Sequence, residues 1–347
     1  MEKISREGYI SCIRFVAMIF IIACHILQGL SLEAAVWINV GVQIFFILSG
    51  YCYGGKKIDN AKEWYKKQLR KIVVPYVILC IIFMAVLYLY ENMGLSQYNK
   101  FYLFGKLIGF QAWIGTIPYL THTWFVSYII LCYLITPFLQ NIKAKKIGSI
   151  LIDVLIFTLF CQLAASYGII NIDASYIMLY LFGYFFRKAE DSKKEENKLT
   201  IFFCVLMIIT LPIRILVQYF NNLTILKVLD YVHVIPAIFI SYHHALLGIV
   251  LFLIMIKLFR RIRYNKFLEI SDKLSYFVYL THQIFILFAF SLLDITDNLF
   301  INIVLILFAI MVSSIGLYYI SKFVNFIINK IINLMNYYIF SREKGYQ

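Results

Sequence analysis

Charged side chains are scarce in this sequence. Asp, Glu, Lys and Arg make up 14% of its 347 residues, whereas 62% of the residues are hydrophobic and 18% are aromatic. Soluble domains carry about 25% charged residues, so this scarcity excludes a soluble domain of such length. The composition instead predicts an all-α polytopic membrane protein.

Sequence motifs for several kinds of chemistry are also missing. The chain has no nucleotide-binding loop, no metal-ligand spacing and no GxSxG nucleophile elbow. Its seven cysteines all lie in apolar segments and none belongs to a CxxC pair, which favours buried thiols that pack as small hydrophobic groups over redox or metal chemistry. We therefore expect no metal and no resident cofactor.

Signals of processing and of internal repetition are absent as well. The first apolar run is longer than the core of a signal peptide and no small-x-small cleavage site follows it, so a cleavable signal is not expected. The chain shows no internal repeat, and an inverted-repeat transporter therefore gains no support from the sequence.

Long apolar runs are what the sequence has in abundance. A membrane-crossing helix needs about 20 mainly apolar residues, and this length divides the chain into about ten predicted transmembrane helices. The predicted spans are 9–30, 36–54, 72–91, 124–141, 148–168, 174–187, 199–219, 240–258, 274–292 and 299–321. A re-entrant or interfacial helix is expected within the longest outer segment, which covers about 91–123.

Lys and Arg residues are unevenly distributed between the loops that these spans define. All but four of the 32 lie in one alternating set of loops or at the adjacent end of span one, and the exceptions are Lys100, Lys106, Arg214 and Lys227. Because short cytoplasmic loops collect Lys and Arg, both termini are predicted to be cytoplasmic. The net charge of +14 then mostly reflects the orientation of the chain in the membrane, and we expect no nucleic-acid partner.

The first predicted span contains two ionisable residues, Arg14 and His25. Such residues are costly inside an apolar span, so each needs a function or a partner there. Eleven residues make roughly three helical turns, which puts both side chains on one face about 16 Å apart. This face offers a cation near one membrane surface and an imidazole much deeper.

A basic segment precedes span three and includes Lys67 and Arg70. These two residues are three positions apart, so on a helix they share a face at the cytoplasmic interface. A positive-inside loop alone would have this composition, and so would a phosphate-binding site for a cytosolic ligand.

Four further residues are candidates for an outer site. His122 and Trp124 lie at the outer end of span four, His282 lies at mid-depth in span nine, and Arg214 lies in the outer half of span seven. Trp is common at membrane interfaces as an anchor, and Arg214 could equally snorkel to the outer headgroups or line a site. Taken singly, each histidine is more typical of a structural residue; together with Arg14 the set favours a functional site.

These residues suit acyl transfer. Histidine has an unperturbed pKa of about 6.5 and can take a proton from an alcohol near neutral pH. Arg14, Lys67 and Arg70 would form an inner cationic zone suited to phosphates. Acyl-CoA has a phosphorylated head and a long flexible arm, so its head could bind in this zone while its thioester reaches His25.

Four motifs carry a resemblance to a known family. The pair Arg14 and His25 in the first span, FFILSGY at 45–51, HTWFVSYIILCYLITPFL at 122–139 and SYFVYLTHQIFI at 275–286 are similar to the motifs of membrane acyltransferase family 3. Members of that family are inner-membrane O-acyltransferases that modify surface polysaccharides and related exported acceptors. The resemblance covers essentially the whole chain in matching order, including the ten-span arrangement.

The resemblance implies roles for individual residues. Arg14 and His25 would be the essential pair, with His25 as general base or transient acyl carrier. Lys67 and Arg70 would match the family's RxxR element, although Lys in the first place loses bidentate phosphate geometry. An acyltransferase-3-like membrane domain is expected over 1–321, followed by a cytoplasmic or interfacial tail over 322–347.

The sequence thus predicts an inner-membrane or plasma-membrane O-acyltransferase. It would move an acyl group, expected to be acetyl, from cytosolic acyl-CoA to a hydroxyl of a cell-envelope glycan, a lipid-linked glycan or another exported acceptor. Membrane lipid is an expected partner, and the oligomeric state is open, a homo-oligomer included. The competing hypothesis is a transporter or flippase for a glycan or anionic solute, which would use the same charges as a path.

Overall fold

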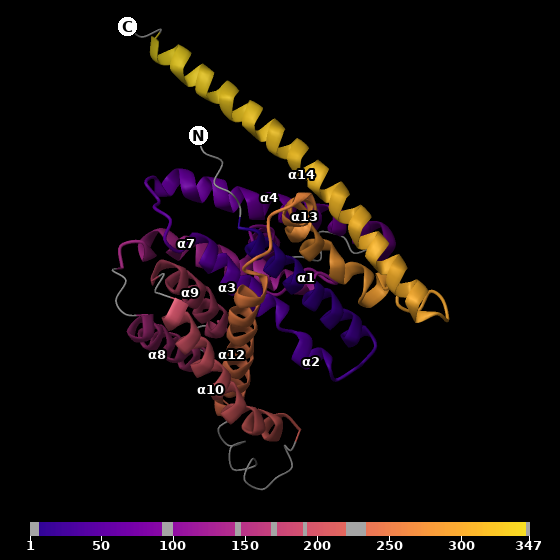
Figure 1. Cartoon of the computed structure of the whole chain (residues 1–347). Helices are drawn as coiled ribbons and strands as arrows, with labels where there is room; N and C mark the ends of the chain where they lie inside the picture. The colour runs from indigo at the N-terminus through magenta and orange to yellow at the C-terminus, as the bar shows by residue number, and fades with distance from the viewer. Residues whose placement is uncertain are drawn as a thin grey trace. The chain divides into compact units, whose positions relative to one another are not determined.

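The structure is a computed structural model, and it describes residues 7–91, 100–142, 147–167, 172–189, 193–219 and 234–344 (Figure 1). Every regular element in these residues is an α-helix or a short 3-10 helix, and none is a strand. The prediction of an all-α fold is confirmed.

Eight helical stretches in the described residues are long and apolar enough to cross a membrane. They cover Gly8–Gly29, Ala35–Tyr53, Ala61–Leu89, Thr121–Leu139, Gly148–Ser166, Glu196–Tyr219, Ile235–Phe259 and Leu299–Met335. Each overlaps one of the predicted spans. The total of ten and the cytoplasmic location of both termini stay predictions.

The two remaining predicted spans do not form helices as long as these eight. The sixth segment is α9 (Ala174–Ala189), which has 16 residues and would be about 24 Å long. The ninth is not one helix across 274–292, because α13 (Lys266–Thr281) ends before His282. Two 3-10 helices follow, η3 (His282–Phe285) and η4 (Phe288–Phe290).

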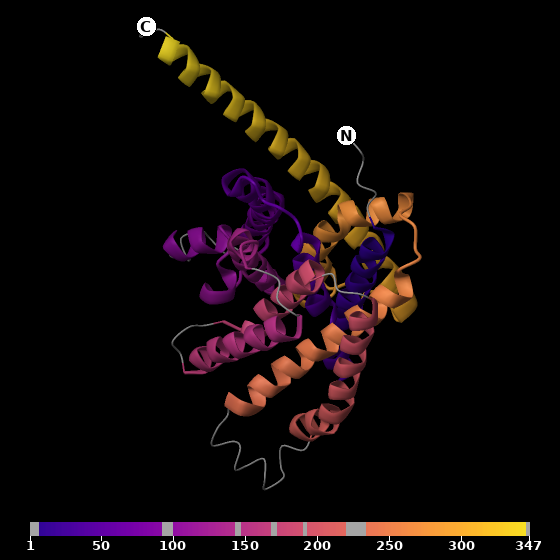
Figure 2. The same cartoon turned by 60° about the vertical axis from the view of Figure 1, so that its left-hand side comes forward.

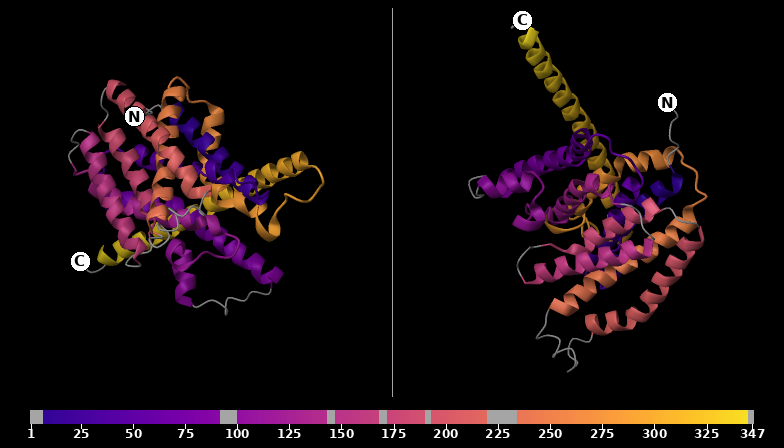
Figure 3. Two further views of the ribbon diagram at one scale, coloured as in Figure 1. Left: turned by 90° about the horizontal axis from the view of Figure 1, so that it is seen from below. Right: turned by 90° about the vertical axis from the view of Figure 1, so that its left-hand side faces the viewer.

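The chain divides into two compact units, and the first comprises residues 1–61 and 128–275. Its helices are α1 (Gly8–Gly29), α2 (Ala35–Ile38), α3 (Gly41–Tyr53), α8 (Ile147–Ser166), α9, α10 (Lys193–Tyr219) and α12 (Val234–Phe259), with most of α7 (Trp124–Leu139) and of α13. Within this unit α3 packs against α1, α9 and α12, while α8 and α10 pack against α9 and α12 respectively. Figures 2 and 3 show α8, α9, α10 and α12 side by side.

Glycine residues allow the closest helix contact in this unit. A Cβ atom on Gly50 of α3 would lie 1.9 Å from the Tyr180 carbonyl oxygen, and one on Gly183 of α9 would lie 2.0 Å from the Ile47 carbonyl oxygen. No side chain fits at either distance, so the backbones of α3 and α9 touch. The glycine in the FFILSGY motif therefore has a packing role.

The second unit comprises residues 62–127 and 276–347. Its helices are α4 (Ala61–Glu91), α5 (Lys100–Leu107), α6 (Gln111–Ile114), η2 (Thr121–Thr123), η3, η4 and α14 (Leu299–Lys344). The helix α4 continues through Pro75, so the basic segment expected as a loop forms the first turns of the helix that becomes span three. The helix α14 runs unbroken past residue 321 (Figure 1).

Candidate functional site

Arg14 lies on α1 and is held by an acidic partner that comes much later in the chain. Its Nη1 donates to Oδ1 of Asp272, and the two side chains form an ion pair that is 24% exposed at Arg14 and 7% exposed at Asp272. The Ser11 hydroxyl donates to the other Asp272 oxygen at 2.7 Å. A partly buried cation is therefore neutralised and fixed in one orientation.

The other terminal nitrogen of the Arg14 guanidinium lies beside a sulfur atom. Nη2 lies 3.9 Å from Sγ of Cys52, near the end of α3. The rings of Tyr53 and Tyr133 pack edge to face with centroids 5.3 Å apart, and both phenols lie within electrostatic range of the guanidinium. The Asp272 pair uses only part of the five N–H donors of Arg14, so the group can also bind a ligand.

His25 lies three turns further along α1 and is half-buried. Its Nδ1 is 2.6 Å from Oε1 of Gln28, one turn away. An amide oxygen only accepts, so Nδ1 donates in this pair and the lone pair of the neutral ring is on Nε2. Gln28 thus sets the tautomer that a general base needs.

The helix face between Arg14 and His25 is turned toward protein. Met18 and Ile21 lie between them at helical spacing, and both are buried. Residues on this side of α1 also meet α3 closely, because a Cβ on Gly41 would lie 2.7 Å from the Ile21 side chain. The face that carries the two ionisable residues therefore packs inside the first unit along its middle.

Lys67 and Arg70 lie on α4, as helical spacing requires, but their surroundings differ. Lys67 is exposed. The Arg70 guanidinium donates from Nε to Oδ1 of Asn325 at 2.6 Å, from Nη1 to Oδ1 of Asn329 at 2.7 Å and from Nη2 to the Asn325 carbonyl at 2.7 Å. Three of the five donors of Arg70 are thus engaged by α14, which fixes the plane of the guanidinium and leaves two N–H groups for other acceptors.

His122 and His282 come together within the second unit. Their rings pack edge to face with centroids 5.0 Å apart. The His122 ring places Nε2 at 3.0 Å from the Leu280 carbonyl and Nδ1 at 2.7 Å from Oε1 of Gln283. Since both neighbours are acceptors, His122 is a hydrogen-bond donor in this network.

Gln283 explains why α13 ends where it does. Its side-chain oxygen accepts from the Thr121 hydroxyl at 2.9 Å and from the His122 backbone N–H at 3.0 Å. The His282 Nδ1 meanwhile donates to the Tyr279 carbonyl at 2.6 Å, an oxygen that the helix would otherwise use for its own ladder. Because these two adjacent polar side chains bind buried partners, the helix ends before the last turns of the expected span can form.

Trp124 and Arg214 lie in different units. Trp124 begins α7 in the second unit and is half-buried. Arg214 lies on α10 in the first unit, is only 3% exposed and has its guanidinium carbon 5.6 Å from the centre of the Trp37 ring. From the sequence, Asp230, Tyr231 and His233 occupy the next outer loop after Arg214 and are further candidates for the outer site, but they lie outside the described residues.

The comparison with protein families decides the identity of the chain. A family model described as an acyltransferase domain matches residues 7–321 of the 347. The chain belongs to membrane acyltransferase family 3. Searches among curated proteins and among solved structures returned no match. The predictions of an acyltransferase and of a multi-pass membrane protein are thus confirmed, and all eight predicted site residues lie in the matched range.

Three polar residues of this acyltransferase were not assigned a role from the sequence. Asp272, Gln28 and Gln283 each hold one of the predicted site residues. Gln28 could have been found, because it lies one turn from His25. Asp272 also carried a signal: a buried Arg needs an anion, and this residue is an acid two positions before a predicted span.

Proposed function

We propose that this acyltransferase moves an acyl group, expected to be acetyl, from cytosolic acyl-CoA to a hydroxyl of a glycan or another exported acceptor of the cell envelope. The observation that supports this most is the arrangement of α1, where a guanidinium anchored by Asp272 shares a helix face with an imidazole whose tautomer is set by Gln28. The proposed location is the inner or plasma membrane.

In the proposed reaction His25 acts as general base. Nε2 takes the proton of the acceptor hydroxyl while its oxygen attacks the carbonyl carbon of the thioester. The C–S bond then breaks, and the departing CoA thiolate takes the proton from the imidazolium. The products are the acceptor ester and free CoA thiol, and His25 returns to its neutral form.

The donor would be positioned by cations. Arg14 has N–H groups beyond those used by Asp272, and they would hold a polar part of acyl-CoA. Lys67 and the two remaining N–H groups of Arg70, which lie in the second unit, are proposed separately as ligands of phosphate groups. The reaction requires a donor that spans the roughly 16 Å between Arg14 and His25 beside the packed middle of α1, a length that suits the pantetheine arm of acyl-CoA.

The acceptor is assigned to the histidine-rich network. We propose that His122, whose two ring nitrogens are held by Gln283 and by the Leu280 carbonyl, positions the wall of the acceptor site, that His282 supports its ring, and that Trp124 stacks on a sugar face. Arg214, which lies in the first unit, is proposed to contact an acceptor only if that acceptor is anionic.

To test this proposal, purified protein in lipid nanodiscs is incubated with acetyl-CoA labelled in the acetyl group and with a crude preparation of envelope glycans. An acyltransferase of this type releases CoA thiol and yields labelled glycan, which mass spectrometry locates. In sealed proteoliposomes, movement of glycan without release of CoA or incorporation of label would contradict the proposal and indicate a transporter.

A further inference from the structure

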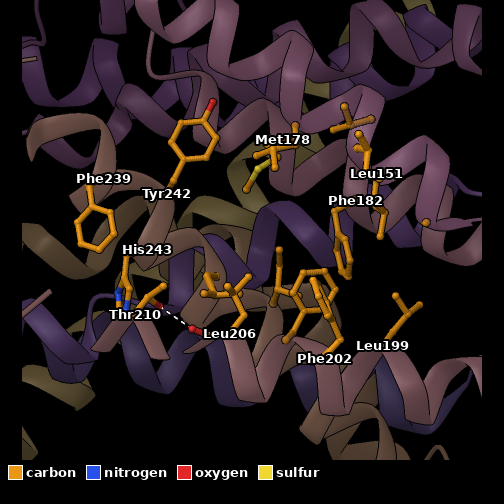
Figure 4. A pocket seen from close by; sticks show the side chains of 17 residues that line it. Leu151, Met178, Phe182, Leu199, Phe202, Leu206, Thr210, Phe239, Tyr242 and His243 are labelled. Atoms are coloured by element: carbon orange, nitrogen blue, oxygen red, sulfur yellow. Dashed lines mark hydrogen bonds between the residues drawn. The ribbon is translucent and has the colours of Figure 1, made fainter. Parts of the chain in front are cut away.

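A large apolar cavity lies within the first unit, away from Arg14 and His25. It has a volume of about 530 Å³ and is lined by residues of α8, α9, α10 and α12 (Figure 4). The lining is almost entirely aliphatic and aromatic, with Leu151, Phe182 and Leu206 among its members. This volume lies within the range of about 300–1,000 Å³ that is typical of ligand pockets.

The cavity has the length of a lipid chain and an opening for one. Along α10 it extends from Leu199 to Thr210, which is roughly 16 Å of helix and about half of the ~30 Å hydrocarbon core of a bilayer. Its walls include Ile152 and Phe202, both 59% exposed on the outer surface of the helices. A hydrocarbon chain in the surrounding bilayer can therefore enter sideways.

One end of the cavity is polar. Figure 4 shows His243 beside Thr210 and Phe239, with Leu199 and Phe202 at the opposite end. His243 is 4% exposed, and its Nε2 has no hydrogen-bond partner. A buried polar atom on the wall of an apolar cavity normally has a partner, so this atom points to a polar group of a ligand.

Arg214 adds a charge to this end. It is one helical turn beyond Thr210 on the same face of α10, and its charge acts on the His243 imidazole. Its Nε and Nη1 atoms are buried without a hydrogen-bond partner, and the described residues provide no acid that pairs with it. Packing over Trp37 offsets only part of the cost of burying a cation.

We propose that this cavity binds an anionic phospholipid, with one hydrocarbon chain along α10 and the phosphate on Arg214 and His243. The apolar part supplies burial for a chain, and the unpaired N–H groups supply charge-assisted hydrogen bonds to a phosphate. A free phosphate would leave the cavity empty, and a lipid without a phosphate would leave Arg214 unpaired. A zwitterionic phospholipid would bring its own cation close to the buried charge of Arg214, so an anionic phospholipid satisfies both ends best.

The test measures bound lipid directly. Protein is reconstituted in nanodiscs that contain equal amounts of phosphatidylglycerol and phosphatidylcholine, released, and weighed by native mass spectrometry. Four variants are compared: Arg214→Gln removes the charge, Arg214→Lys keeps it, Leu206→Trp fills the cavity, and Ile208→Trp adds the same bulk at a residue that is 70% exposed and does not line the cavity. The melting temperature of each variant reports folding.

Wild type and Ile208→Trp are expected to retain one phosphatidylglycerol in preference to phosphatidylcholine. Arg214→Gln should lower that preference at least about tenfold, the factor that corresponds to 1.4 kcal/mol, Arg214→Lys should keep part of it, and Leu206→Trp should retain no lipid. Equal retention of both lipids by wild type, or unchanged retention by a folded Arg214→Gln, would overturn the proposal. The measurement uses neither donor nor acceptor, so its outcome is independent of the acyl-transfer proposal.

Discussion

The ion pair between Arg14 and Asp272 gives the sharpest prediction from the structure. Replacing Asp272 by Asn removes the negative charge but keeps the size of the side chain and its ability to accept from Ser11. Arg14 then remains in place without its counter-ion. The change should affect both the stability of the first unit and the orientation of the guanidinium.

The size of the effect follows from the burial of the two groups. Breaking a buried ion pair costs about 3–5 kcal/mol, because the remaining charge is uncompensated. The Arg14 side chain is 24% exposed, so water offsets part of this cost and a value near the lower limit, about 3 kcal/mol, is expected. At about 2–4 °C per kcal/mol for domains of this size class, the melting temperature should fall by roughly 6–12 °C.

The assay follows melting in detergent and acyl transfer in nanodiscs for Asp272→Asn and for a matched control, Asp59→Asn. Asp59 pairs with Lys57, but these side chains are 75% and 86% exposed, and surface pairs of this kind contribute little. The control should therefore melt like wild type. In the Arg14→Gln/Asp272→Asn double variant much of the stability should return, while transfer stays low. A folded Asp272→Asn protein with wild-type melting and wild-type transfer would refute the reasoning.

Three further predictions concern packing, donor binding and acceptor binding. Gly50→Ala should abolish folding, because its Cβ would overlap the Tyr180 carbonyl. The control Gly316→Ala on α14 has open space around the added methyl and should raise the free energy of unfolding by about 0.5–1 kcal/mol. Equal melting temperatures for the two variants would contradict the packing account. Lys67→Arg should lower the KM for acyl-CoA severalfold at constant kcat by restoring bidentate phosphate binding; an unchanged KM would count against a donor role. His122→Asn should lower transfer at least about tenfold with unchanged donor affinity; full transfer would exclude His122 from the acceptor site.

The lengths of the apolar runs alone predict much of the fold. Where the structure differs from that prediction, the cause is local. The segment before span three was expected to be a loop because it is basic. It contains neither Gly nor Pro between Ala61 and Val74, and Glu63 lies in the first turn of the helix, where a negative charge is favourable. The helix therefore begins about three turns earlier than its apolar part.

The functional candidates were only partly predictable for a different reason. The spacing of Arg14 and His25 sets their common face, and the structure keeps it because α1 is unbroken from Gly8 to Gly29. The partner of Arg14 lies 258 positions away, and no local pattern specifies such a contact. Likewise, the apolar run around His282 predicts a span by hydropathy, whereas the hydrogen bonds of Gln283 end the helix.

The most direct test of the central claim is the rate of acyl transfer from labelled acetyl-CoA by His25→Ala, measured beside His244→Ala. The control removes another histidine side chain in a membrane-spanning helix, one that contacts the Asn39 carbonyl at 2.6 Å. If His25 is the general base, its variant should reach the membrane and bind the donor while transfer falls by about 10²–10⁴-fold, and the control should keep most of its activity. Transfer by His25→Ala at the wild-type rate would contradict the account.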